Sequence, residues 1–161
     1  MTDVAPANTM DAQPVPPRRL AELPSWLLSR AAGVGAGIVG EALAAQGMRK
    51  HHFSVLHSLA EGGSVSQAEL GRRLGIDRSD LHAVLGELEA SALVVRTPDA
   101  HDRRRNTVTI TRLGSTRLAE LDTVIDDAQD RLLAALDEPE RAELRRLLIL
   151  LLGTSIGGAG S

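Results

Sequence analysis

The sequence predicts a mostly α-helical protein with one short β-hairpin, an α+β fold. Three observations favour this class. Apolar residues recur at helical spacing over long stretches, as in Leu118, Leu121, Val124, Ile125, Ala128, Leu132 and Leu136. Only two short runs, "LVVRT" and "TVTIT", alternate at the two-residue period of a strand. Aromatic residues are 1% of the chain, so Leu, Ala, Val and Ile must build a core of closely packed helices.

Composition narrows the possible functions. The formal net charge over 161 residues is -3, so any nucleic-acid-binding surface must be a local patch. The absence of cysteine excludes disulfides, thiolate metal sites and cysteine nucleophiles. The N-terminus lacks the pattern of a secretory signal. The most apolar run, Leu147 to Gly153, is far shorter than the roughly 20 residues of a membrane helix. We therefore expect a cytoplasmic protein with no membrane partner.

The first 48 residues divide into two parts. Residues 1–23 are proline-rich without an apolar period, which predicts a disordered tail. Residues 24–48 predict a helix that begins near Pro24 and ends at Gly47. Four glycines inside this helix weaken it. They either permit the close approach of a second helix or leave a marginal helix that packing must hold.

The next segment predicts three helices in quick succession. The first runs from Arg49 to Glu61 and is expected to bury Phe53, Leu56, Leu59 and Ala60. Ser66 and Glu69 form a capping-box pattern ahead of a short helix, Gln67 to Leu74. After the turn Gly75-Ile76-Asp77, Asp77 caps a helix from Arg78 to Ser91. The residues expected to close the small core are Ala68, Leu70, Leu74, Ile76, Leu81, Val84, Leu85 and Leu88.

Two short helices joined by a tight, glycine-containing turn form a helix-turn-helix. The two alternating runs follow it and predict a hairpin, so residues 49–111 predict a winged helix-turn-helix domain. From Arg112 the helical period returns to about Leu136, and Asp137 with Pro139 opens a last, leucine-dense helix. Residues 154–161 predict a flexible tail.

The leucine-dense helices indicate a homodimer. A helix that is apolar nearly all round must be buried on more than one side, and the small winged core cannot cover it. A symmetric dimer can. We therefore expect residues 24–48 and 112–153 to be dimerisation helices flanking the winged domain.

Residues from about 24 to 153 resemble the MarR family, the multiple-antibiotic-resistance regulators. The resemblance is carried by "LGIDRS", by the "LxxLExxxLV" run into the hairpin, and by the "DRR…VTIT..G" passage into the next helix, in this order over about fifty residues. It implies a homodimeric winged-helix repressor that binds a pseudo-palindromic operator in double-stranded DNA. It also implies release by a small-molecule effector, often phenolic or otherwise anionic.

The hairpin tip holds the most conspicuous charge in the sequence, Arg103, Arg104 and Arg105. Without context, such a cluster is usually a solvated surface. On a wing the arginines would lie beside the duplex backbone, and one could enter the minor groove. The resemblance implies that Asp102 pairs with Arg104 and fixes the loop, leaving Arg103 or Arg105 to reach the DNA.

The second helix of the motif should enter the major groove with its N-terminal residues toward base edges. The side chains expected to face DNA there are Arg78, Ser79, Asp80 and His82. Ser66 and Gln67 are expected at phosphates, although Ser66 is equally suited to plain helix capping. The sequence departs from the family where basic or hydroxyl residues are common, at Asp80 and Ala83, and where a glycine is common, at Ala92.

The effector pocket implied by the resemblance lies between the dimer helices and the winged domain. The residues that would line it are Trp26, Arg30, His51, His52 and His57. Trp26 offers a stacking face and Arg30 a partner for an anion. The alternative is that Trp26 is a core residue and Arg30 a surface residue, with no role in ligand binding. His52 and His57 lack the i, i+4 spacing of a helical metal pair, so no metal site is expected.

The sequence contains no G-x-S-x-G, P-loop, Rossmann glycine pattern or paired-carboxylate cluster. We therefore expect neither an enzyme nor a cofactor. The rival hypothesis is a winged-helix protein-interaction scaffold with weak or lost DNA binding. Asp80 and Ala83 fit that hypothesis, whereas the wing arginines argue against it.

Overall fold

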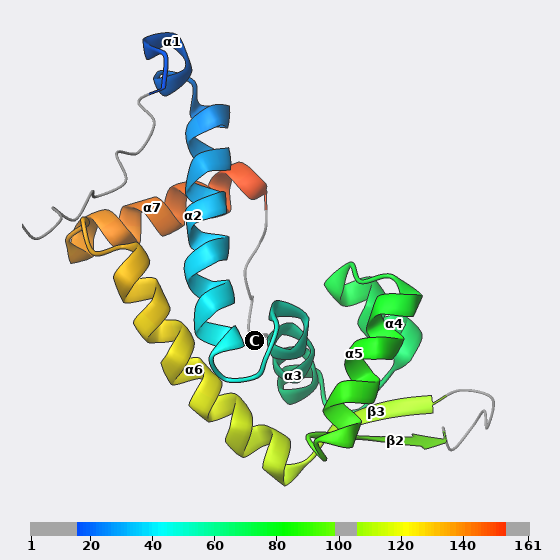
Figure 1. The fold of residues 1–161 in the computed structure, drawn as a ribbon. Coiled ribbons are helices and arrows are strands. Elements are labelled where there is room, and N and C mark those ends of the chain that lie inside the picture. The colour runs from blue at the N-terminus through cyan, green and yellow to red at the C-terminus, as the bar shows by residue number, and fades with distance from the viewer. Residues whose placement is uncertain (1–15, 99–105, 154–161) are drawn as a thin grey trace, which may run out of the picture. The chain divides into compact units, whose positions relative to one another are not determined.

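The computed structural model describes residues 16–98 and 106–153, and it confirms the predicted mostly helical winged fold (Figure 1). The elements in chain order are α1 (Arg18–Ala21), α2 (Pro24–Ala44), α3 (Lys50–Gly62), β1 (Val65–Ser66), α4 (Gln67–Leu74), α5 (Arg78–Ala90), β2 (Val94–Pro98), β3 (Asn106–Ile110), α6 (Arg112–Leu132) and α7 (Glu138–Leu152). The chain divides into two compact units within α2, one ending at Val34 and the other beginning at Gly35.

The first unit contains a helix that the sequence did not predict. The four-residue helix α1 follows Pro17, whose fixed φ suits the residue before a helix. Arg18 and Glu22, one turn apart, add an exposed ion pair at 3.5 Å. In the same unit, the Arg30 guanidinium carbon lies 5.5 Å from the centre of the Trp26 ring.

The helix α2 is more hydrophobic than the sequence analysis recognised. By length and composition alone it could cross a membrane, since an 18-residue window within its 21 residues reaches a mean hydropathy of 1.3. It is the one such helix among the described residues. Its hydropathy was overlooked because glycines and a few polar residues divide its Leu, Ile, Val and Ala residues, so that they form no long unbroken apolar run.

In the second unit the hairpin belongs to a three-stranded antiparallel sheet of order β1-β3-β2. The pairing of β2 with β3 runs from Val94 opposite Ile110 to Pro98 opposite Asn106. The strand β1 was not predicted; it is only two residues long and pairs Val65 with Val108. A two-residue strand has no period to detect.

The core lies among α3, α4, α5, α6 and the sheet. Its fully buried side chains include Leu56, Leu59, Leu70, Leu85, Leu88, Val108 and Leu121. Four expectations were wrong in whole or part: Ala60 and Ala68 are exposed, while Phe53 and Leu74 are only half-buried against the core. The inner face of α3 instead combines His52 and Val55 with Leu56 and Leu59. Because successive helical residues turn by about 100°, a face centred on this set leaves Ala60 outside.

Two glycines allow the close packing of the winged domain. Gly75 ends α4 with φ of +62°, the left-handed conformation that glycine adopts without strain. A Cβ atom at Gly71 would lie 3.1 Å from the Ile76 carbonyl oxygen, so α4 approaches the turn closely there. The helix-turn-helix geometry therefore depends on both positions.

The last helices differ from the prediction mainly in length. α6 ends at Leu132 rather than near Leu136, and Arg141 binds the intervening turn by donating to the Leu136 carbonyl at 3.1 Å.

No residue of α7 is buried. Leu150, Leu151 and Leu152 are 69%, 65% and 72% exposed, so this unit leaves a leucine-rich surface uncovered.

Candidate nucleic-acid interface

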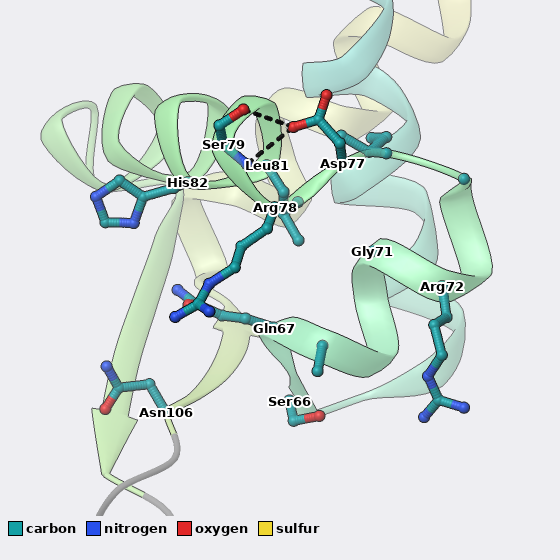
Figure 2. A pocket seen from close by; sticks show the side chains of 13 residues that line it. Ser66, Gln67, Gly71, Arg72, Asp77, Arg78, Ser79, Leu81, His82 and Asn106 are labelled. Atoms are coloured by element: carbon teal, nitrogen blue, oxygen red, sulfur yellow. Dashed lines mark hydrogen bonds between the residues drawn. The ribbon is translucent and has the colours of Figure 1, made fainter.

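A surface groove lies where α4, α5 and β3 meet (Figure 2). Five of the predicted DNA-binding residues line it, namely Ser66, Gln67, Arg78, Ser79 and His82. Residues 66 and 67 lie at the start of α4, while 78, 79 and 82 occupy the first turns of α5. The fold therefore gathers the N-terminal ends of two helices on one face, although Gln67 and Arg78 are eleven positions apart in the chain. Asp80, also predicted to face DNA, is exposed but does not line the groove.

The start of α5 is held by one carboxylate oxygen. Oδ1 of Asp77 accepts from the backbone N–H of Ser79 and of Asp80, both at 2.9 Å, and from the Ser79 hydroxyl at 2.7 Å. These hydrogen bonds, led by that from the Asp80 backbone, lower the pKa of Asp77 below its usual range. Asp77 therefore orders the turn that presents Arg78, and its cap leaves the Ser79 oxygen free to accept.

Arg78 is the basic side chain best placed for a ligand in this groove. It extends from α5 into the groove in Figure 2, and it has no acidic partner among residues 16–98 and 106–153. Arg72, which the sequence analysis did not select, also lines the groove, but it pairs with Glu69 and points away from Arg78. Asn106, at the start of β3, was also missed, because a strand-end asparagine carries no signal in the sequence.

The start of α4 forms only half of the predicted capping box. Oγ of Ser66 accepts from the Glu69 backbone N–H at 3.2 Å, which confirms its capping role. The Glu69 carboxylate does not return to Ser66 but binds Arg72 and Arg73 instead, the latter at 2.8 Å. Two guanidinium groups within one turn attract it more strongly than one backbone amide. These arginines also lower the pKa of Glu69.

Gln67 presents an unused hydrogen-bond donor beside this cap. Its Nε2 atom is buried and has no hydrogen-bond partner in the described structure. Figure 2 shows the side chain extending into the groove from α4. Because burial of an amide without a partner is costly, rotation of this side chain toward a ligand acceptor in the groove would relieve the cost.

The hairpin contributes less free charge than the sequence suggests. Arg96, on β2, is largely buried and donates from Nε to Glu89 at 2.9 Å. That hydrogen bond lowers the pKa of Glu89. The predicted wing residues Asp102, Arg103, Arg104 and Arg105 lie outside the described residues.

The residues predicted for an effector pocket have separate surroundings. Trp26 and Arg30 belong to the first unit and contact each other. In the second unit His51 is exposed, whereas His52 is 4% exposed with Nε2 3.0 Å from Glu87. Nε2 of His57 lies 2.7 Å from Asp122, and its ring meets the edge of Phe53. Three or more metal-ligating side chains do not cluster anywhere in residues 16–98 and 106–153.

Comparison with known proteins links these features to one family. A model described as the MarR family matches residues 46–105. An HTH-type transcriptional repressor from Mycobacterium tuberculosis is 29% identical over 123 residues, covering 76% of this chain and 88% of that protein. The crystal structure of a MarR-family transcriptional regulator from Rhodococcus sp. RHA1 is 30% identical with a TM-score of 0.70, covering 79% of this chain and 90% of that one.

A third comparison concerns the fold alone. The structure of a mutant MarR from E. coli, complexed with operator DNA, superposes with a TM-score of 0.69 at 24% identity. The match covers 80% of this chain and 92% of the E. coli chain. Another protein with this winged architecture has therefore been seen in complex with operator DNA.

Proposed function

Because this chain belongs to the MarR family, we propose that it is a transcriptional repressor that binds a specific sequence in double-stranded DNA. The observation that carries the proposal is the groove that joins the starts of α4 and α5. Helix N-termini carry partial positive charge, which favours phosphate. Arg78 adds a full charge and a bidentate donor, which suits guanine or phosphate.

The roles of individual residues follow from their positions. Ser66 and Gln67 would contact backbone phosphates, while Arg78, Ser79 and His82 would approach base edges in the major groove. Asp80 would accept from cytosine N4. Arg103, Arg104 and Arg105 would contact the flanking backbone or minor groove, with Asp102 bracing Arg104.

We further propose that the protein acts as a homodimer in the cytoplasm. The exposed leucines of α7 support this, because a solvent-exposed surface of three consecutive leucines is unfavourable in a monomer. Two-fold symmetry would present two α5 helices to half-sites about 34 Å apart, one turn of DNA, which a pseudo-palindromic operator supplies. Residues 24–48 and 112–153 would form the dimer, and residues 49–111 would bind DNA.

Operator binding tests the proposal. Purified protein is titrated against a labelled duplex from upstream of its own gene and against an unrelated duplex of the same length, at several salt concentrations. We expect tighter binding to the upstream duplex and a loss of affinity with rising salt. Arg78→Ala should weaken operator binding, whereas Arg19→Ala at the exposed helix α1 should not. Equal affinity for both duplexes would favour the interaction-scaffold hypothesis.

We propose, finally, that a small-molecule effector releases the protein from its operator. An anionic aromatic ligand would stack on Trp26 and pair with Arg30, which contact each other within the first unit. Salicylate is a simple phenolic carboxylate for a first test. Release of the labelled operator by salicylate from wild type, but not from Arg30→Ala, would support this pocket, and equal release from both would exclude Arg30.

A further inference from the structure

Glu87 lies on a different side of α5 from the residues that line the groove. It is nine positions after Arg78, which places the two side chains about 180° apart around the helix axis. Glu87 faces the start of α3 instead. It is therefore positioned to affect how α5 sits in the domain without itself lining the groove.

Two residues of the α3 N-terminus contact this carboxylate. Nη2 of Arg49 donates to Oε1 at 2.5 Å. Nε2 of the buried His52 lies 3.0 Å from Oε2, although its N–H does not point at that oxygen in hydrogen-bond alignment. The Arg49 hydrogen bond lowers the pKa of Glu87, so the carboxylate stays charged at neutral pH. Arg49, His52 and Glu87 together form the α3–α5 clamp, which joins the start of α3 to α5.

The neutral form of His52 fits the clamp. Its Nδ1 accepts from the Arg49 backbone N–H at 3.1 Å, so the ring proton must reside on Nε2, which faces Glu87. Burial first, and then Arg49 and His51, lower the pKa of His52, whereas Glu87 raises it. These are the charged groups acting on the ring from α3 and α5. Protonation would remove the Nδ1 acceptor and disturb the start of α3.

We propose that Glu87 is a positioning residue, which through Arg49 and His52 holds α5 against α3 and so sets the angle at which Arg78 meets the operator. This inference rests on the proposed function. A side chain that is half exposed adds little to folding by itself. Its effect on the orientation of α5, in contrast, changes the geometry of every base contact that the helix makes.

The sign of the change in DNA affinity on removing the Glu87 charge distinguishes a positioning role from simple electrostatic repulsion. Removing a negative charge from a DNA-binding helix should strengthen binding to any duplex, because repulsion of phosphates is relieved. A positioning role predicts the reverse for the operator alone. Glu87→Gln keeps the size of the side chain and removes its charge, so it tests the two accounts against each other. Glu61→Gln, an exposed acid at the end of α3, is the matched control.

The experiment measures the Kd of wild type, Glu87→Gln and Glu61→Gln for the operator and for an unrelated duplex. We expect Glu87→Gln to weaken operator binding about five- to tenfold, a size typical of coupled contacts, without weakening binding to the unrelated duplex. Arg49→Gln should cost less operator affinity in the Glu87→Gln background than in wild type. Glu61→Gln should leave both affinities unchanged.

A titration of the His52 ring by NMR reports the clamp without DNA. Because Glu87 raises the pKa of His52, Glu87→Gln should lower that pKa further, and Glu61→Gln should not. An unchanged His52 titration, or operator binding by Glu87→Gln as tight as wild type or tighter, would overturn the inference. If wild type itself fails to prefer the operator, the proposed function falls and the inference with it.

Discussion

The carbonyl oxygen of Leu93 occupies the space in which a side chain at Gly114 would begin. A Cβ atom built on Gly114 would lie 2.1 Å from that oxygen and 2.8 Å from the Ile110 side chain. Thr111 closes the same junction, since its hydroxyl donates to the Ala92 carbonyl at 2.8 Å and accepts from the Gly114 N–H at 2.9 Å. The hairpin and α6 therefore join through a contact that only glycine permits.

Gly114→Ala should accordingly destabilise the protein by about 3 kcal/mol or more, because the backbone must move to admit the methyl group. Chemical denaturation measures the loss. Gly86→Ala is the control, since nothing lies within 4 Å of its added Cβ atom in mid-α5. It should raise stability by about 0.5–1 kcal/mol. A Gly114→Ala protein as stable as wild type would refute the account of this junction.

Ala92→Gly should stabilise the protein by about 0.5–1 kcal/mol, since the left-handed conformation is costly for alanine and free for glycine. Ala92 has φ of +57° at the exit of α5, where the family resemblance pointed to glycine. Ala90→Gly, two residues earlier at the exposed end of α5, should lose stability instead. Thermal melts of the two variants should therefore shift in opposite directions.

Stability should fall as pH decreases below about 6.5 because of His52. Its folded-state pKa lies below 6.5, its ordinary value, so between the two the unfolded chain binds a proton that the native ring does not. The contribution is fully present above 6.5 and is lost as pH falls toward the folded pKa. Denaturation at several pH values should show this slope in wild type and in His51→Gln. His52→Gln should reduce this dependence of stability on pH. If His52→Gln shows the same slope as wild type, another group must be responsible for it.

The Asp77 cap should matter for both folding and DNA binding. Asp77→Ala should lower the melting temperature and weaken operator binding, because the turn that carries Arg78 and Ser79 loses three hydrogen bonds. Asp77→Asn should retain most of both properties, since an amide oxygen can still accept. The cap is strongest above the ordinary pKa of 3.8 and is lost as pH falls through the lowered native value.

Arg103→Ala should weaken operator affinity by about 1–3 kcal/mol while the dimer stays intact. Fluorescence anisotropy with a labelled operator measures the affinity, and light scattering measures the mass. An unchanged affinity would remove Arg103 from the mechanism.

Leu151→Glu should dissociate the proposed dimer, because it introduces a charge into the exposed leucine surface of α7. Ala60→Glu, on the exposed face of α3 and outside the proposed dimerisation helices, is the control and should remain dimeric. Light scattering that finds wild type monomeric at micromolar concentration would contradict the dimer directly.

Local sequence rules accounted for most of the winged domain. The bounds of α4 and α5, the caps at Ser66 and Asp77, and the inward set Leu81, Val84, Leu85 and Leu88 were all predictable. Each depends on residues within a few positions, namely a capping side chain, a helical period or a glycine with positive φ. The family resemblance added the expectation of glycine at position 92, for which the structure supplies the physical reason.

What the sequence determined alone was therefore the kind and order of elements, since periodicity and capping are properties of neighbouring residues. Tertiary structure decided the rest: the approach of Gly114 to Leu93, the pairing of Arg96 with Glu89, and the contact of His52 with Glu87. It also decided that residues 66, 67, 78 and 82 share one groove with Asn106. These relationships join residues far apart in the chain, and only the packing of helices against the sheet brings such residues together.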